Sequence, residues 1–232
     1  MNRFAAVHNT LADQSMTNLL SRLLNQLRDK RARPPVLVKE LGERDRRRML
    51  RHFLALSESD RLLRFGSLLK DEQIEKYVAK IDFERDIVFG VLNRRFQLVG
   101  VGHLAFLEKR GDRLNATTKD RVAEFGVSVS GSGRGQGVGT ALFERAAIHC
   151  RNSDIDTLYM QCLSSNKTMM HIAKKAGMQI KREYGEADAY LHLPPPSPGS
   201  VLQEAFQEQF ATFDYAVKAN ARAAMRWFGA KK

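Results

Sequence analysis

The stretch VSVSGSGRGQGVGTALFERAA, residues 127–147, places five glycines between a strand-like run and a helix-like run. Glycine has no side chain, so main-chain N–H groups can close around an anion in such a turn. A helix that begins near Gly137 adds its unsatisfied first-turn amides and the positive end of its dipole. Arg134 adds a charge-assisted donor. The stretch therefore predicts a phosphate-binding turn, and a diphosphate would suit it.

Two better-known phosphate loops do not match this stretch. No Gly-Lys-Ser/Thr sequence follows the glycines, which excludes the P-loop of nucleoside triphosphatases. The dinucleotide fingerprint Gly-x-Gly-x-x-Gly fails in every register, because the sixth position holds Gln136, Val138, Thr140 or Leu142. The remaining alternative is a flexible glycine loop without a ligand.

The prolines divide the chain. All six fall into two clusters, Pro34–Pro35 and PPPSPGS at 194–200. Proline ends helices and cannot donate to a sheet ladder, so both clusters are expected to be joints. We expect a helical amino-terminal extension at 1–33, a catalytic or binding domain at 34–193, a proline-rich linker at 194–200 and a carboxy-terminal helix at 201–232.

Both extensions carry apolar residues at helical spacing. They are Met16, Leu20, Leu23 and Leu27 in the first, and Leu202, Phe206, Phe210, Phe213, Val217, Ala221, Ala224 and Phe228 in the second. The 4-4-3 rhythm of the second is an eleven-residue period, unlike the heptad of a left-handed coiled coil. Neither stripe can be buried within its own helix. Packing against the domain, packing against the other extension and a helical homodimer interface stay open as alternatives.

The domain itself has the pattern of a mixed α/β (α+β) fold. Strands are expected at 35–41, 86–93, 96–107, 121–129, 157–163, 178–184 and 187–193, and helices at 43–56, 58–80, 137–151 and 166–176. The second helix has a break near Gly66. This order predicts a central sheet of six to seven strands that is flanked by helices.

Two motifs resemble those of the GNAT acetyltransferase superfamily. RGQGVG at 134–139, after a strand, is similar to its motif A, Arg/Gln-x-x-Gly-x-Gly. SSNKTMMHIAKKAGMQI at 164–180 resembles its motif B, with matches at Asn166, Lys175, Gly177 and Met178. An ordinary capped helix also explains Asn166 and Gly177. The resemblance covers about 36–193.

The resemblance implies the GNAT fold, with a mixed and mostly antiparallel sheet. It implies acetyl-CoA as the cofactor and transfer of the acetyl group to a primary amine by direct attack. The alternative is a non-catalytic module that binds acyl-CoA in regulation or assembly. The residues that the resemblance assigns to coenzyme A are Val127, Val129, Arg134, Gly135, Gln136, Gly137, Val138, Gly139, Thr140 and Asn166.

Glu124 is the predicted general base, and the alternative is a solvent-facing glutamate on a half-exposed strand. In the strand before the turn, Ala123, Phe125, Val127 and Val129 form an apolar face, and Glu124 stands on the opposite face. A free lysine amine has a pKa of about 10.4, so acetyl transfer at pH 7 needs a base. Relatives of similar pattern carry this acid ten residues before the Arg/Gln position, as Glu124 stands before Arg134. Burial in the cleft is expected to help it accept a proton.

The general acid is unassigned. Many relatives place a tyrosine seven residues after the motif-B asparagine, where this chain has Ala173. His171, Cys162 and Ser165 are nearby alternatives. A thiolate leaving group with a pKa near that of free cysteine, about 8.5, needs only modest help to leave.

The segment LSESDRLLRFG, residues 56–66, resembles one in the GNAT domains of bacterial protein-lysine acetyltransferases. Ser57 is expected to cap a helix whose Leu62, Leu63 and Phe65 face inward and whose arginines face out. The resemblance places this helix on the acceptor side of the cleft, opposite the turn at 184–188. Glu186 and Asp188 of that turn either attract a cationic amine or are simply solvated.

Composition also limits the classes of partner that we expect and the cellular compartment. The net charge of +12 favours anionic partners in general, but no known nucleic-acid-binding module is present. No apolar run has the length of a membrane span, and histidine and cysteine lack metal-ligand spacing. The two cysteines, without a paired motif, favour a reducing, cytoplasmic setting. The acceptor is either a small molecule or a protein amine.

Overall fold

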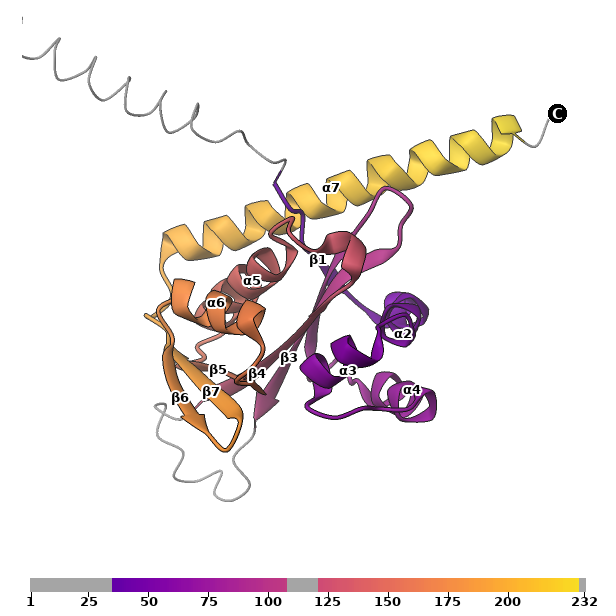
Figure 1. Cartoon of the computed structure of the whole chain (residues 1–232). Coiled ribbons are helices and arrows are strands. Elements are labelled where there is room, and N and C mark those ends of the chain that lie inside the picture. Colours follow the sequence, from indigo (N-terminus) through magenta and orange to yellow (C-terminus); the bar gives the residue numbers. More distant parts are fainter. Residues whose placement is uncertain (1–34, 108–120, 230–232) are drawn as a thin grey trace, which may run out of the picture. The chain divides into compact units, whose positions relative to one another are not determined.

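The computed structural model describes residues 35–107 and 121–229. The predicted helix at 1–33 and the predicted loop at 108–120 lie outside them. The centre is a seven-stranded sheet in the order β1-β2-β3-β4-β5-β7-β6 (Figure 1). The strands are β1 (Lys39–Leu41), β2 (Ile87–Leu92), β3 (Leu98–Leu107), β4 (Val122–Val129), β5 (Thr157–Leu163), β6 (Gln179–Glu183) and β7 (Glu186–His192). Among the described strands only β4 and β5 run parallel, so the sheet is mixed and mostly antiparallel, as predicted.

Helices cover both faces of this sheet. They are α2 (Arg46–Leu54), α3 (Glu58–Phe65), α4 (Asp71–Lys80), α5 (Val138–Asn152), α6 (Lys167–Lys175) and α7 (Pro198–Gly229), with short 3-10 turns η1 (Glu43–Asp45) and η3 (Gly131–Gly133). The apolar face of β4 packs under α5 and α6 in one core, where Phe125 and Leu142 are fully buried. A second core lies on the other face, where Phe53 of α2 and Ile74 of α4 meet Val101 of β3.

The first predicted strand is shorter in the structure, and the predicted break in the second helix near Gly66 is confirmed. Only Lys39–Leu41 of the expected strand at 35–41 pairs with β2, and it forms the edge of the sheet. The expected helix at 58–80 is two helices, because Gly66 ends α3 in the left-handed conformation with φ of 71°. Ser57 caps α3 as expected, since its hydroxyl accepts the Asp60 N–H.

Phe65 of α3 packs inward against the second core as predicted, but the other side chains of this helix do not lie as predicted. Leu62 and Leu63 are exposed, while Arg61 and Arg64 turn toward the domain. Arg61 donates to main-chain oxygens of Leu54 and Leu56, at the end of α2. These carbonyls lack helical partners, and the long arginine stem lets the guanidinium satisfy them from inside.

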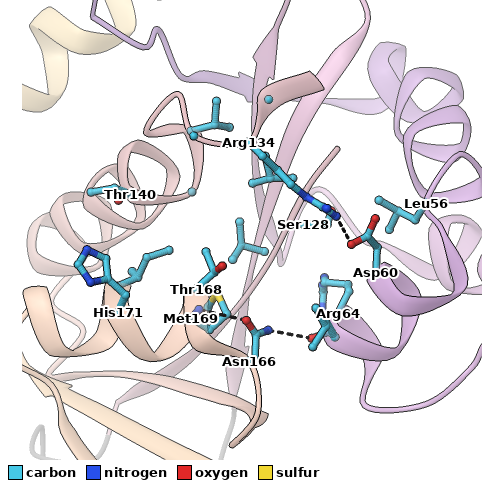
Figure 2. Close-up of a pocket in the computed structure, with 18 of the residues that line it drawn as sticks. Leu56, Asp60, Arg64, Ser128, Arg134, Thr140, Asn166, Thr168, Met169 and His171 are labelled. Atoms are coloured by element: carbon cyan, nitrogen blue, oxygen red, sulfur yellow. Dashed lines mark hydrogen bonds and ion pairs between the residues drawn. The ribbon is translucent and has the colours of Figure 1, made fainter. Parts of the chain in front are cut away.

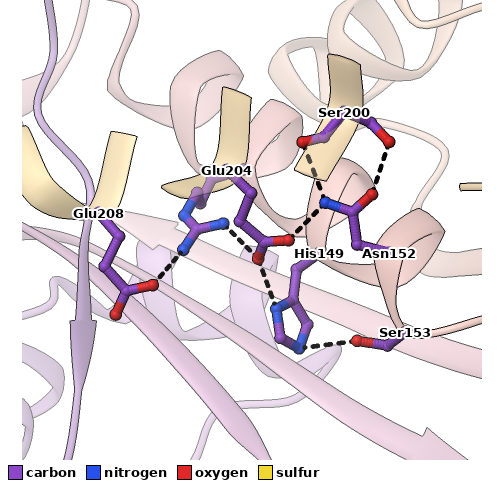
Figure 3. A network of polar contacts seen from close by, with 7 residues as sticks. His149, Asn152, Ser153, Ser200, Glu204 and Glu208 are labelled. Carbon is purple, nitrogen blue, oxygen red and sulfur yellow. Dashed lines mark hydrogen bonds and ion pairs between the residues drawn. The ribbon is translucent and has the colours of Figure 1, made fainter. Parts of the chain in front are cut away.

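The helix α7 docks on the domain through polar side chains (Figure 3). The helix begins at Pro198, so it includes the last three residues of the expected linker at 194–200. Glu204 accepts hydrogen bonds from Arg145 Nη1 at 2.6 Å, His149 Nδ1 at 2.8 Å and Asn152 Nδ2 at 2.6 Å, all on α5. The Ser200 hydroxyl donates to Asn152 Oδ1 at 2.6 Å. Burial alone would raise the pKa of Glu204, but these hydrogen bonds outweigh it and lower the pKa to about 2.

The apolar stripe of α7 points away from the domain. Leu202, Phe206, Phe210, Phe213 and Val217 are between 50% and 70% exposed. The alternative in which this part of the stripe packs against the domain is therefore wrong. The side chains of Ala221, Ala224 and Phe228 lie outside the described ones.

Candidate active site

The site is the gap where β4 and β5 separate. Their parallel pairing runs from Val122 beside Thr157 to Glu124 beside Tyr159 and then stops, although both strands continue. A cavity of about 580 Å³ lies along the end of β4 beyond Glu124, which does not line it, between α3 on one side and α5 and α6 on the other (Figure 2). Two strand edges that no longer pair leave main-chain groups available to a ligand.

The open edge of β4 presents Val127 and Val129. Ser130 N–H bonds to Val99 O of β3, and main-chain groups alternate in direction along an antiparallel strand. The N–H and C=O groups of Val127 and Val129 therefore face away from β3 and toward the gap. Both residues line the cavity.

The turn after β4 forms an amide cradle at the N-terminus of α5. Gly135 and Gly137 have φ of 69° and 79°, a conformation that residues with a Cβ atom rarely adopt. Gly137 is the N-cap of α5 and offers no side-chain cap. The first-turn amides of Val138, Gly139 and Thr140 precede the first intrahelical bond, which Ala141 N–H makes to Gly137 O. These groups fit a diphosphate by hydrogen bonding and by charge.

Two side chains of the turn that were predicted to bind coenzyme A, those of Arg134 and Gln136, make contacts within the protein instead. The Arg134 guanidinium crosses the cavity and forms an ion pair with Asp60 of α3 (Figure 2). Gln136 does not line the cavity, because its Nε2 donates to Ser132 O at 2.7 Å and closes the turn. The pairing with Asp60 therefore directs the Arg134 guanidinium to the α3 side of the cavity.

Asn166 begins α6 on the far side of the gap. Its side chain accepts the Met169 N–H at 3.1 Å and lies 3.5 Å from Leu63 O of α3. Asn166 is buried and lines the cavity. It therefore caps α6, as the sequence predicts, and connects the helix to α3 across the cleft.

Glu124 stands at the last paired position of β4, beside Tyr159. It is exposed, so the expectation that it is buried in the cleft is wrong. Its face of the sheet also carries Asp188, which accepts the Tyr159 hydroxyl at 2.7 Å. Burial, with this hydrogen bond to Asp188 second, raises the pKa of Tyr159. Hence the exposed Glu124 carboxylate, the Tyr159 phenol and the Asp188 carboxylate lie on one face of the sheet, near the point where β4 and β5 separate.

The comparisons with known proteins agree with this geometry. The model of the acetyltransferase (GNAT) family matches residues 25–178. This chain belongs to the GNAT acetyltransferase family. A search of curated proteins finds no match. As a GNAT enzyme, the chain is an N-acetyltransferase whose donor is acetyl-CoA.

Solved GNAT structures share its fold. The GNAT domain of S. lividans PAT is 20% identical, with a TM-score of 0.55 over 67% of this chain and 89% of that one. Spermidine N-acetyltransferase from Vibrio cholerae, in complex with CoA and spermine, is 17% identical, with a TM-score of 0.52 over 68% and 96%. Phosphinothricin acetyltransferase from Sinorhizobium meliloti, in complex with AcCoA, is 13% identical, with a TM-score of 0.51 over 70% and 93%.

The alternatives for a general acid in this GNAT enzyme lie in different places. His171 lines the cavity from α6. Cys162 is buried against Met170, with 4.0 Å between the sulfur atoms, and Ser165 is exposed and does not line the cavity. Ala173 is fully buried. Of the three alternatives, only His171 reaches the cleft.

Sequence reasoning missed a histidine beneath the cleft. His52 Nδ1 lies 3.0 Å from Leu98 O and its Nε2 lies 2.8 Å from Ser128 Oγ, which lines the cavity. Since burial lowers the pKa of His52, the neutral ring donates to the carbonyl and accepts the serine hydroxyl. No local sequence signal links residues this far apart.

Some features are absent from the described part of the GNAT domain. No group of three His, Cys, Asp or Glu side chains within 35–107 and 121–229 is arranged to hold a metal ion. Among the helices described, none combines the length and apolar character that a bilayer span requires.

Proposed function

We propose that the enzyme transfers the acetyl group of acetyl-CoA to a primary amine by direct attack, with Glu124 as general base. The amine nitrogen bonds to the thioester carbonyl carbon, Glu124 accepts a proton from the amine, and the C–S bond breaks. The sulfur leaves as a thiolate and takes up a proton. The observation that carries the proposal is the position of Glu124, where β4 and β5 separate.

The donor is proposed to enter the gap along β4. The cradle of residues 135–140 binds the diphosphate through main-chain amides, and Arg134 adds a positive charge. The pantetheine arm pairs with the main chain of Val127 and Val129, in the manner of an added strand. An amide of this edge polarises the thioester carbonyl. Asn166 lines the opposite wall.

A panel of amines and peptides, scored by release of free CoA thiol, tests this function. We expect saturable acetyl-CoA binding by calorimetry and thiol release with at least one class of amine. No binding at millimolar acetyl-CoA would contradict the proposed donor site. Binding without thiol release from any amine would instead favour the non-catalytic acyl-CoA-binding module.

The acceptor is a small-molecule or protein amine that approaches from the side of α3 and the β6–β7 turn. Asp188 and Glu186 give this side negative charge, and Gln161 Nε2 donates to Glu186 at 2.9 Å. The structural neighbours bound to spermine or named for phosphinothricin show that one fold serves different amines. Cys150 and Cys162 are buried free thiols, which supports a reducing, cytoplasmic compartment. We propose that neither nucleic acid nor a membrane is a specific partner of this protein.

We also propose a homodimer through α7. Five large apolar side chains follow one stripe of this helix, and an exposed apolar stripe of this length favours association. A second copy offers the same stripe, as a two-fold interface requires.

Phe210→Glu on this stripe is expected to convert a dimer to a monomer in size-exclusion chromatography with light scattering. A charge at the centre of the stripe cannot be buried without a partner. Ala205→Glu, on another exposed side of α7, is the matched control and should leave the mass unchanged. A wild-type monomer, or a Phe210→Glu dimer, would contradict the proposal.

A further inference from the structure

Arg64 is a cation in the cleft wall for which the described part of the chain supplies no counter-ion. It lies near the end of α3, is partly buried and lines the cavity (Figure 2). Its Nη2 donates to the Tyr77 hydroxyl at 2.9 Å, and its Nε is buried without a hydrogen-bond partner. Within the described residues no carboxylate forms an ion pair with it, whereas Arg134 across the cavity is paired with Asp60.

Such a guanidinium is costly to remove from water without an anion. The aromatic rings of Phe65 and Tyr77 lie 5.0 and 5.7 Å from its central carbon and offset part of this cost. The planar fork of arginine matches a carboxylate, which accepts two parallel hydrogen bonds from it. The site is therefore charged and shaped for a ligand carboxylate.

The guanidinium lies against the main chain of β4 at Gly126. A Cβ atom there would lie 2.5 Å from Arg64 Nη1, so the contact depends on glycine at this position. Gly126 follows Glu124 by two residues on the same face of β4, about 7 Å along the strand. It directly precedes Val127 at the open edge. Arg64 thus stands between the proposed base and the proposed pantetheine path.

Hydrogen bonds fix the position of Arg64. Tyr77 Oη, which accepts from Arg64, lies 2.9 Å from His103 Nδ1. His103 Nε2 in turn lies 3.1 Å from Asp86 Oδ2. Burial, and second the charge of Arg64, lower the pKa of His103, so the ring is neutral and accepts the Tyr77 proton at Nδ1. Tyr77 is thereby turned with its lone pairs toward the guanidinium.

We propose that Arg64 binds a carboxylate of the acceptor, so that the preferred acceptors are amines that also carry a carboxylate group. This inference rests on the proposed function, in which the amine meets Glu124. An amino acid has opposite charges at its two ends. Its ammonium end faces the carboxylates of Glu124 and Asp188, and its carboxylate end faces Arg64.

Matched acceptors test this specificity. Glycine, β-alanine, 4-aminobutyrate and 6-aminohexanoate are each compared with their carboxamide in the thiol-release assay. We expect the best carboxylate acceptor to exceed its carboxamide in kcat/KM by about tenfold to a hundredfold. The ratio falls to about one in Arg64→Gln, and Arg64→Lys retains part of it. Arg51→Gln, which removes an exposed arginine of α2, leaves the ratio unchanged.

Other outcomes overturn the proposal. They are equal kcat/KM values for the two members of every pair in the wild type, or a ratio that survives in folded Arg64→Gln. A preference for succinyl-CoA over acetyl-CoA that Arg64→Gln abolishes would place the carboxylate in the donor, and it would overturn the assignment to the acceptor. If Arg64→Gln does not fold, the proposal is tested by the ratio of kcat/KM for the carboxylate to kcat/KM for the carboxamide. This ratio must exceed one in the wild type and be smaller in Arg64→Lys.

A binding measurement separates this inference from the proposed function. N-acetyl-β-alanine and its carboxamide are titrated into CoA-saturated protein and followed by saturation-transfer NMR. We expect the carboxylate to bind at least tenfold more tightly in the wild type, and to lose this advantage in Arg64→Gln. This result supports the carboxylate site even if no amine is acetylated, an outcome that would contradict the proposed function alone. Equal binding of both compounds to the wild type would overturn the site.

Discussion

Glu124→Gln is expected to lower kcat by a factor of about 10² to 10⁴ at pH 7, the usual contribution of a general base. Glutamine keeps the size and polarity of the side chain but cannot accept the amine proton. The Kd for acetyl-CoA should stay within about threefold, because the cradle and the open edge of β4 do not include the Glu124 side chain. Steady-state thiol release and calorimetry measure the two effects separately.

The pH profile provides a second criterion for Glu124. The deficit of the variant should narrow as the pH rises toward the amine pKa of about 10.4, since more of the amine is then already neutral. Glu183→Gln, an exposed glutamate of β6, is the matched control and should keep wild-type turnover. Unchanged turnover of Glu124→Gln at pH 7 would remove Glu124 from the role.

Glu204→Gln is expected to lower the free energy of unfolding by about 3 kcal/mol. A pKa of about 2, against 4.5 for a free glutamate, corresponds to this amount at neutral pH, because one pKa unit is about 1.4 kcal/mol. The partner Arg145 has a side chain that is only 2% exposed, so the variant removes the nearer of the two carboxylates that pair with a buried charge. Urea denaturation followed by circular dichroism measures the loss.

The matched control is Glu208→Gln. Glu208 also contacts Arg145, at 3.3 Å, but its side chain is 53% exposed, and we expect a loss below about 1 kcal/mol. Since folding lowers the pKa of Glu204, its contribution is present above about pH 4.5 and is lost as the pH falls toward 2. Equal stability of the two variants would contradict the central role of Glu204 in docking α7.

The sequence predicted the proposed donor side of the cleft more completely than the proposed acceptor side. The glycine pattern determines main-chain conformation, so the turn, the helix after it and the face of Glu124 followed from local rules. Asp60 beside Arg134 and His52 beneath Ser128 depend on contacts between distant segments, for which the sequence has no local signal. Leu62 and Leu63 of α3 were wrongly predicted to face inward. Apolar periodicity takes no account of an arginine side chain that turns inward to satisfy buried main-chain carbonyl groups.

The carboxy-terminal helix shows a similar limit. Its spacing predicted a helix, but two stripes of α7 share the same 4-4-3-4 rhythm. One is apolar, and the other contains Ser200, Glu204 and Glu208. The polar stripe faces the domain because Arg145 and His149 of α5 are largely buried and need acceptors there.

Where β4 and β5 separate, main-chain groups form most of the proposed donor site and side chains form the proposed acceptor site. The proposed donor site depends mostly on peptide groups, which point mutations other than those of glycine leave in place. The proposed acceptor site depends on the side chains of Arg64, Glu124 and Asp188, which single substitutions replace. Such a scaffold can change the amine that it modifies through a few codon changes while its use of acetyl-CoA persists.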